Sequence, residues 1–213
     1  MNEPRQYSKL DALCLKVDQA LRTLLCEPVH THRSYPAENI PEAASLDAKH
    51  SAGIMRINHA GEVCAQALYQ GQSLFSNNPE IKAKMQQAAV EEGDHLKWCG
   101  QRLIELNSHV SYLNPLWYAG SFSIGAIAGM LGDAWSLGFV AETETQVIKH
   151  LESQLQLLPV EDLRSYKILQ QMQEDEGKHR QDAIYYGAKE LPAPVKTVMN
   201  FTAKIMVKTS YWI

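Results

Sequence analysis

The sequence predicts an all-α protein. Apolar residues recur at spacings of three and four along most of the chain, and no stretch of useful length alternates between apolar and polar residues. Prolines, glycines and asparagines divide the 213 residues into segments of helical length. Hydrophobic residues make up 45% of the chain, which is enough for one folded core. A net charge of −4 argues against a nucleic-acid partner.

The first 46 residues predict one short helix and a linker. Ser8 and Asp11 have the spacing of a capping box. The apolar stripe of this helix comprises Leu10, Leu13, Val17, Leu21 and Leu24. Residues 27–46 contain three prolines and little periodicity, so we interpret them as a surface linker. We therefore divide the chain into residues 1–46 and a helical bundle of residues 47–213.

Two long helices are expected next, from about residue 47 to 76 and from 79 to 106. The sequence Asn77-Asn78-Pro79 separates them, because asparagine favours the N-cap and proline the first helical position. The second helix has the clearest pattern in the chain. One of its faces carries Ile81, Met85, Ala88, Glu92, His95, Cys99 and Leu103.

The segment from Leu106 to Ala141 has Asp133 as its only formally charged residue. Its uninterrupted apolar part, residues 116–132, would be about 25 Å long as a helix, which is short of a membrane span. One interpretation is a helix buried in its own bundle, with glycines allowing close contact. The other is a helix that faces a membrane or binds lipid, which we favour.

Two more helices complete the predicted bundle and its C-terminus. Pro159 separates the helix that contains Glu144 from one around residues 163–188. After Pro192 and Pro194 comes an amphipathic segment with apolar residues on one side and Lys196, Lys204 and Lys208. Such a basic amphipathic helix is typical of a membrane interface.

Glu-x-x-His places a carboxylate and an imidazole one helical turn apart, where both can bind one metal ion. Three such motifs occur, and the one at Glu27 is discarded because it contains a proline in a non-helical stretch. The other two share their context, as Glu91-Glu92-Gly93-Asp94-His95 and Asp175-Glu176-Gly177-Lys178-His179. Both lie on apolar faces, where an unpaired carboxylate is strongly unfavourable.

The spacing of the turns predicts that these motifs face two further glutamates. Glu62 lies fifteen residues before Asn77, and Glu92 lies fourteen after Asn78. In an antiparallel hairpin both residues would be about 21–22 Å from the turn. The second hairpin repeats this arrangement, with Glu144 fifteen residues before Pro159 and Glu176 seventeen after it.

Four carboxylates and two imidazoles from four helices form the ligand set of a ferritin-like di-iron or di-manganese bundle. The predicted ligands, which are also the predicted catalytic residues, are Glu62, Glu92, His95, Glu144, Glu176 and His179. We expect two iron ions, one at Glu62 and His95 and one at Glu144 and His179, with Glu92 and Glu176 bridging both. Residues 116–132 then form the long hydrophobic crossover helix of such a bundle, and an amphipathic helix follows at the C-terminus.

Several segments resemble the demethoxyubiquinone hydroxylase family of ubiquinone biosynthesis. They are Met55–Glu62, Gln66–Gln72, Glu92-Gly93-Asp94-His95-Leu96, Asn114-Pro115-Leu116-Trp117 and Asp175–His179. The resemblance covers about residues 47–213 and includes all six predicted ligands. It implies a di-iron monooxygenase that uses dioxygen to hydroxylate the ring of a polyprenyl demethoxyubiquinone or its quinol. It also implies that His150 lies just outside the metal ligands.

The resemblance also implies where the protein works and with what. Family members associate with membranes, so we expect peripheral binding to the cytoplasmic side of a bacterial cell membrane. Lipid-binding or other ubiquinone-biosynthesis proteins are further candidate partners. The chain start and the four cysteines without C-x-x-C spacing agree with an intracellular protein. The oligomeric state and the reductant stay open.

Three rival functions are compatible with parts of the pattern. A ferritin-like ferroxidase is the main alternative, although two symmetric motifs and the apolar segment of residues 106–141 argue against it. A soluble manganese catalase or ribonucleotide reductase subunit would need no lipid surface. A membrane adaptor with a structural metal would consume no oxygen. Tyr69 and Tyr118 have no spacing that assigns them a role, and Cys64 and Cys99 are interpreted as core residues.

Overall fold

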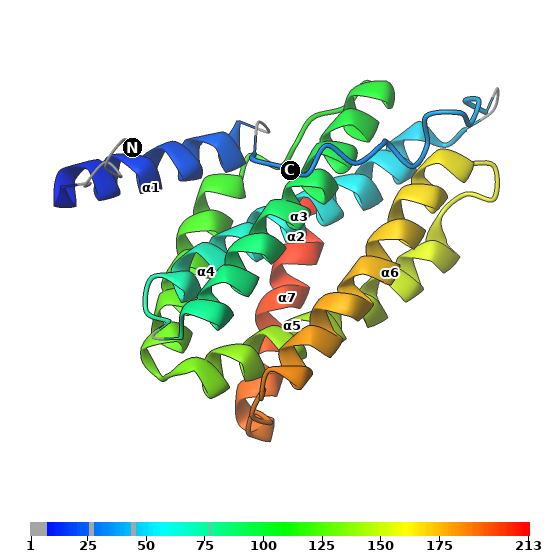
Figure 1. The fold of residues 1–213 in the computed structure, drawn as a ribbon. Coiled ribbons are helices and arrows are strands. Elements are labelled where there is room, and N and C mark those ends of the chain that lie inside the picture. Colours follow the sequence, from blue (N-terminus) through cyan, green and yellow to red (C-terminus); the bar gives the residue numbers. More distant parts are fainter. Residues whose placement is uncertain (1–7, 26–27, 44–45, 77) are drawn as a thin grey trace.

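Figure 1 shows the computed structural model, which is all-α as the sequence predicts. The structure describes residues 8–25, 28–43, 46–76 and 78–213. Within these ranges there are seven helices and no strand. The helices are α1 (Lys9–Leu24), α2 (Ala48–Ser73), α3 (Pro79–Glu105), α4 (Asn114–Met130), α5 (Asp133–Leu157), α6 (Leu163–Tyr185) and α7 (Ala193–Ser210).

Local capping sets where these helices begin. The capping box between Ser8 and Asp11 is present at the start of α1. Asn78 caps α3 by accepting the backbone N–H of Glu80 at 2.9 Å, and Pro79 is the first helical residue. Asp162 caps α6 in the same way, since its side chain accepts the N–H of Ser165 at 3.0 Å. The sequence predicted the caps at Ser8 and Asn78, whereas it predicted only the break at Pro159 before α6 and not the cap at Asp162.

Helices α2, α3, α5 and α6 form the bundle as two hairpins, α2–α3 and α5–α6 (Figure 1). Two apolar clusters fill its interior. One contains Met55, Trp98, Leu151, Ile168, Leu169 and Met172, and the other Tyr69, Ile81, Met85, Leu137, Val140 and Ala183. On each of the four helices the predicted metal ligands lie between a residue of the first cluster and a residue of the second. The predicted site is therefore polar in the middle of an apolar bundle.

The charge-poor segment forms α4, the hydrophobic crossover helix, and it packs closely along α2. A Cβ atom on Gly125 would overlap the carbonyl oxygen of Leu68, and one on Gly71 would overlap that of Phe122. Glycine therefore lets the two helix backbones touch. The outer face of α4 leaves Leu116, Ile127, Met130 and Leu131 exposed. One side of α4 is thus packed in the fold, while the other presents apolar side chains to its surroundings.

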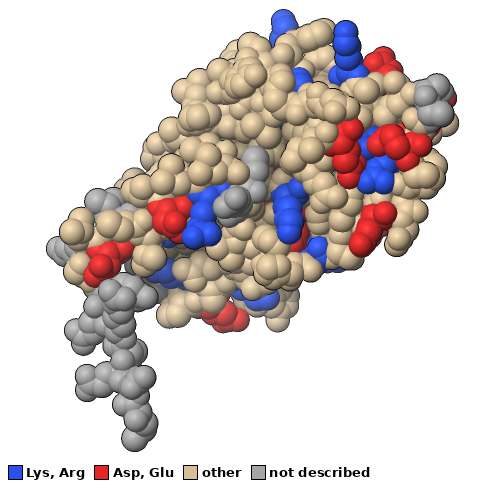
Figure 2. All heavy atoms as spheres, turned by 90° about the horizontal axis from the view of Figure 1, so that it is seen from above, with Lys and Arg blue, Asp and Glu red and all other residues tan. Residues whose placement is uncertain are grey.

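The two ends of the chain pack on this bundle differently. Helix α1 leaves Leu10, Val17 and Leu21 of its predicted apolar stripe exposed. The C-terminal end of α7 is held against α2, because Arg56 Nη1 donates to the carbonyl of Tyr211 at 2.6 Å. Among the described residues, none of the helices is both long and apolar enough to cross a membrane. Figure 2 shows a wide area of one face without Lys, Arg, Asp or Glu.

Candidate metal centre

The bundle brings all six predicted ligands to its interior, and each of them is buried. Glu62 comes from α2, and Glu144 comes from α5. The two Glu-x-x-His motifs come from α3 and α6, which face each other across the bundle. Helical spacing explains why each motif points inward as a unit, since residues three apart share a face.

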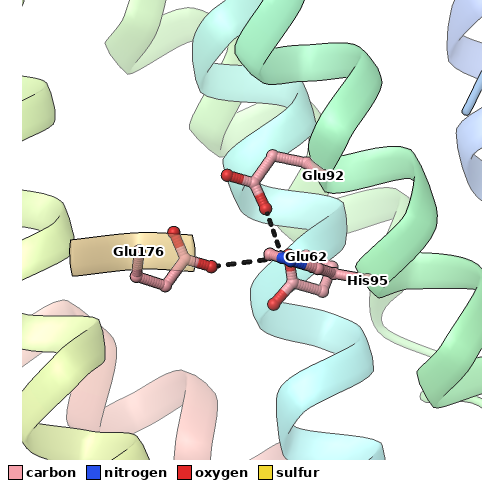
Figure 3. Close-up of side chains that lie close together, drawn as sticks. All are labelled: Glu62, Glu92, His95 and Glu176. Atoms are coloured by element: carbon pink, nitrogen blue, oxygen red, sulfur yellow. Dashed lines mark hydrogen bonds and ion pairs between the residues drawn. The ribbon is translucent and has the colours of Figure 1, made fainter. Parts of the chain in front are cut away.

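The first half of the site surrounds His95 (Figure 3). His95 Nδ1 lies 3.0 Å from Glu92 Oε2, 3.3 Å from Glu176 Oε1 and 3.8 Å from Glu62 Oε2. Glu62, Glu92, His95 and Glu176 each offer a ligand atom, and these four atoms lie within 4.8 Å of one another. That spacing would allow one cation to contact all four groups.

The second half of the site surrounds His179. Its Nδ1 lies 3.0 Å from Glu92 Oε1 and 3.3 Å from Glu176 Oε2. Each of these two glutamates therefore presents one oxygen to His95 and the other to His179. Glu144 lies near enough to feel the charges of Glu176, Glu92 and His179, and it accepts a hydrogen bond from the hydroxyl of Tyr69 at 2.8 Å.

The electrostatics of the site suit a bound cation. Burial and the neighbouring charge of Glu92 raise the pKa of Glu62 well above its ordinary value. Burial and the charge of Glu176 do the same to the pKa of Glu144. Glu62 Oε2 has no hydrogen-bond partner among the described residues. Four buried carboxylates with too few donors need positive charge, and oxygen ligands with one imidazole per half suit iron or manganese.

A further acidic residue holds the outer nitrogen of each histidine. His95 Nε2 lies 3.2 Å from Asp175 Oδ2, and His179 Nε2 lies 2.8 Å from Glu91 Oε2. Burial would lower the pKa of His95, but hydrogen bonds to Asp175 and the surrounding glutamates raise it. A ligating histidine commonly uses its second nitrogen in this way, which sets the orientation of the ring.

Sequence reasoning missed the roles of Asp175 and Glu91, although both stand in the repeated motif context. Each precedes a glutamate ligand and pairs with the histidine of the opposite motif. It named Tyr69 without assigning it a role, although Tyr69 lies seven residues after Glu62 and so on the same face of α2. That spacing was the available signal.

Other residues singled out in the sequence have different surroundings. Cys99 is buried in the core, where its thiol contacts Met172 Sδ at 3.7 Å. His59, which belongs to the Met55–Glu62 segment, is buried beside Asn114, and burial lowers its pKa to about 4. His150 is half-buried on α5, and its Nε2 has no hydrogen-bond partner among the described residues. Cys26 and Glu27 lie outside the described residues.

The fold places the protein in the ferritin-like class of helical bundles. A solved structure of a dodecameric thioferritin, the bacterioferritin-related protein from Bacteroides fragilis, matches with a TM-score of 0.56 and 18% identity. The match covers 66% of this chain and 86% of the thioferritin. At this identity the likeness supports the shared fold alone.

Sequence comparison is more specific. Residues 49–210 match the family described as "Ubiquinone biosynthesis protein COQ7". A 3-demethoxyubiquinol 3-hydroxylase from Acinetobacter baumannii is 53% identical over 210 residues, which are 98% of this chain and the whole of that protein. The proteins of the same name from Nitrosococcus oceani and Nitrosomonas eutropha are 51% and 50% identical over 99% and 96% of this chain, and 100% and 99% of their own lengths. The chain belongs to the COQ7 family.

Proposed function

We propose that this protein is a 3-demethoxyubiquinol 3-hydroxylase, a monooxygenase in a late step of ubiquinone biosynthesis. It would add one oxygen atom of dioxygen to the vacant ring carbon of a polyprenyl demethoxyubiquinol, and the other atom would leave as water. The near full-length similarity to relatives of that name supports this activity. The structural observation that supports this activity most directly is the burial of four carboxylates and two histidines in the middle of the bundle.

The six buried ligands would hold two iron ions. Glu62 and His95 would bind one, Glu144 and His179 would bind the other, and Glu92 and Glu176 would bridge. The two oxygens that Glu92 and Glu176 each direct to opposite histidines support the bridging role. When bound, ferrous iron supplies electrons and open coordination positions for reaction with dioxygen.

The residues around the ligands would prepare the site for this chemistry. Asp175 and Glu91 would keep each histidine ring oriented with Nδ1 toward the metal. Tyr69 would hold the Glu144 carboxylate through its hydroxyl hydrogen bond. The two apolar clusters on either side would keep bulk water away from the reacting groups.

A membrane surface would present the substrate, since a polyprenyl chain is soluble only in lipid. Exposed apolar side chains on α4 and α7 support this contact. They include Leu116, Ile127, Met130 and Leu131 on α4, and Val198, Phe201 and Ile205 on α7. We infer peripheral association with the cytoplasmic side of the cell membrane, in which the tail stays in lipid while the ring reaches the metal site.

Single-turnover oxidation in lipid would test the activity. The protein would be loaded with iron, counted by metal analysis, reduced anaerobically and mixed with a polyprenyl demethoxyubiquinol and ¹⁸O₂. One labelled oxygen in the quinol ring, seen by mass spectrometry, is the expected result. Unchanged quinol from a sample that holds two irons and consumes oxygen would contradict the hydroxylase and favour the ferroxidase alternative.

A further inference from the structure

Residues 28–43, which we name the N-terminal strap, lie across α3 and α6 on the histidine side of the site. A Cβ atom on Gly93 would overlap the carbonyl oxygen of Val29, so the strap rests directly on the backbone of α3. Farther along, Tyr35 donates to Glu105 of α3 at 3.1 Å, and Arg164 of α6 donates to the carbonyl of Ile40. The match to the COQ7 family begins at residue 49, after the strap.

Arg33 is the strap residue that reaches toward the metal centre. Its Nη1 lies 2.7 Å from Asp175 Oδ2, and its guanidinium stacks over the ring of Trp98 at 4.9 Å. The same oxygen of Asp175 lies 3.2 Å from His95 Nε2. A continuous row of contacts therefore runs from Arg33 through Asp175 to His95, whose other nitrogen faces Glu92.

The opposite histidine has a weaker support. His179 Nε2 is held by Glu91, whose side chain is one-third exposed. Gln87, a neutral residue, donates to Glu91 Oε1 at 2.9 Å. Among the described residues, the ion pairs of Glu91 involve His179 alone. In the part of the chain that the structure describes, an arginine contacts Asp175 and none forms an ion pair with Glu91, so the two histidines are supported differently.

We infer that Arg33 is a positioning residue for the half of the metal site that contains His95. It fixes the Asp175 carboxylate, and Asp175 fixes the imidazole with Nδ1 toward the glutamates. This inference rests on the proposed metal site. Loss of an outer hydrogen-bond partner of a ligating histidine typically lowers metal affinity by about 10–100-fold. Removing Arg33 should therefore weaken one of two metal equivalents and leave the other nearly unchanged.

Lys178 provides a matched control. It is the second cation that binds Asp175, but it contacts Oδ1 at 2.9 Å, the oxygen that does not face His95. Its side chain is 69% exposed, so its removal should disturb little else. Arg164→Ala is the second control, because it removes one contact of the far end of the strap, the hydrogen bond to the carbonyl of Ile40, and leaves Arg33 and Asp175 intact.

Anaerobic Co²⁺ titration of the full-length protein would test the inference, with binding followed by visible absorption and bound metal counted after dialysis. We expect wild type, Lys178→Ala and Arg164→Ala to bind two equivalents alike. Arg33→Ala should lose about 10-fold in affinity for one equivalent, the lower end of the range for a direct partner of a ligating histidine, because Arg33 acts through Asp175. Arg33→Lys should restore part of this affinity. In Arg33→Ala, the Co²⁺ absorption band that differs from wild type should be the one that appears as the weakened equivalent binds.

Three outcomes would overturn the inference. Arg33→Ala could titrate like wild type, which would remove any role of Arg33 in the site. Arg164→Ala could show the same loss as Arg33→Ala, which would assign the effect to strap docking in general. A wild-type protein that binds no metal would refute the proposed metal site, and the inference with it. Circular dichroism of each variant would show whether its helices are retained.

Discussion

Glu92 contacts both histidines, since one of its carboxylate oxygens lies 3.0 Å from His95 Nδ1 and the other lies 3.0 Å from His179 Nδ1. Glu176 does the same at 3.3 Å on each side. A carboxylate elsewhere on α3 could not replace that of Glu92, because only this position lets one side chain contact both His95 of α3 and His179 of α6. The chemistry of the site therefore depends on a small number of atoms.

A prediction at the residue scale concerns these two glutamates. Glu92→Ala or Glu176→Ala should lose most of the bound iron, because each removes a ligand that both halves share. Metal analysis after anaerobic loading measures this directly. Two irons per chain in either variant would refute the bridging assignment.

Asp133→Leu is the matched control for the metal prediction. Asp133 accepts hydrogen bonds from Ser76 Oγ at 2.8 Å and from the backbone N–H of Asn78 at 3.1 Å, at the turn before α3. Its loss should lower the free energy of unfolding by roughly 0.5–1.5 kcal/mol, the net contribution of a typical hydrogen bond, because water can replace the carboxylate at this partly exposed turn. Iron content should stay at the wild-type value, and a parallel loss of iron would contradict the separation of the two sites.

At the scale of elements, the backbones of α2 and α4 approach each other closely at glycines. Gly125 of α4 touches the Leu68 carbonyl of α2, whereas Gly120 of the same helix has no atom within 4 Å of an added Cβ. One helix therefore contains a glycine that the fold requires and one that it does not.

This difference gives a paired prediction. Gly125→Ala should destabilise the protein by roughly 1–3 kcal/mol, because the Cβ pushes against a backbone that cannot move aside. Gly120→Ala should stabilise it by up to about 1 kcal/mol, because alanine favours the helix. Thermal or chemical unfolding of both variants measures the two changes. Equal effects would show that α4 does not pack against α2 as described.

At the scale of the whole molecule, the polar centre is enclosed in the bundle while apolar side chains on α4 and α7 face outward. The proposed metal ligands are thus sheltered from water, and the exposed apolar side chains lie on a different surface of the same protein. Deleting α7 would be a poor test of that surface. Tyr211 just beyond α7 binds Arg56 and His50 of α2, so the deletion would also disturb the bundle.

Point substitutions separate the two effects. Phe201 and Val198 of α7 are each 64% exposed, and replacing either with aspartate should weaken liposome binding about 10-fold or more, because burying such a side chain in lipid is worth about 1.5–3 kcal/mol. Co-sedimentation with phosphatidylglycerol-containing vesicles measures binding. Val160→Asp, at an 88% exposed position between α5 and α6, should bind like wild type. Unchanged binding of the α7 variants would remove this helix from the lipid surface.

The sequence by itself determined the helices and predicted the six residues that the bundle buries in its interior, because both follow from local spacing. Caps at Ser8 and Asn78 and the periodic face of α3 are readable over a few residues. Nearly equal distances from each turn predicted that Glu62 is level with Glu92, and Glu144 with Glu176, without knowledge of the packing. The motifs that resemble the demethoxyubiquinone hydroxylase family agree with the match of residues 49–210 to the COQ7 family.

Only the tertiary structure decided which groups support those ligands. Asp175 pairs with His95, 80 residues away, and Tyr69 pairs with Glu144, 75 residues away. Arg33 contacts the Asp175 carboxylate from a segment whose three prolines predicted only a surface linker. Such contacts depend on the register and rotation of packed helices, which helical periodicity does not contain. A hydrogen bond between distant residues needs atoms placed to within a few tenths of an ångström, and only the packed bundle provides that placement.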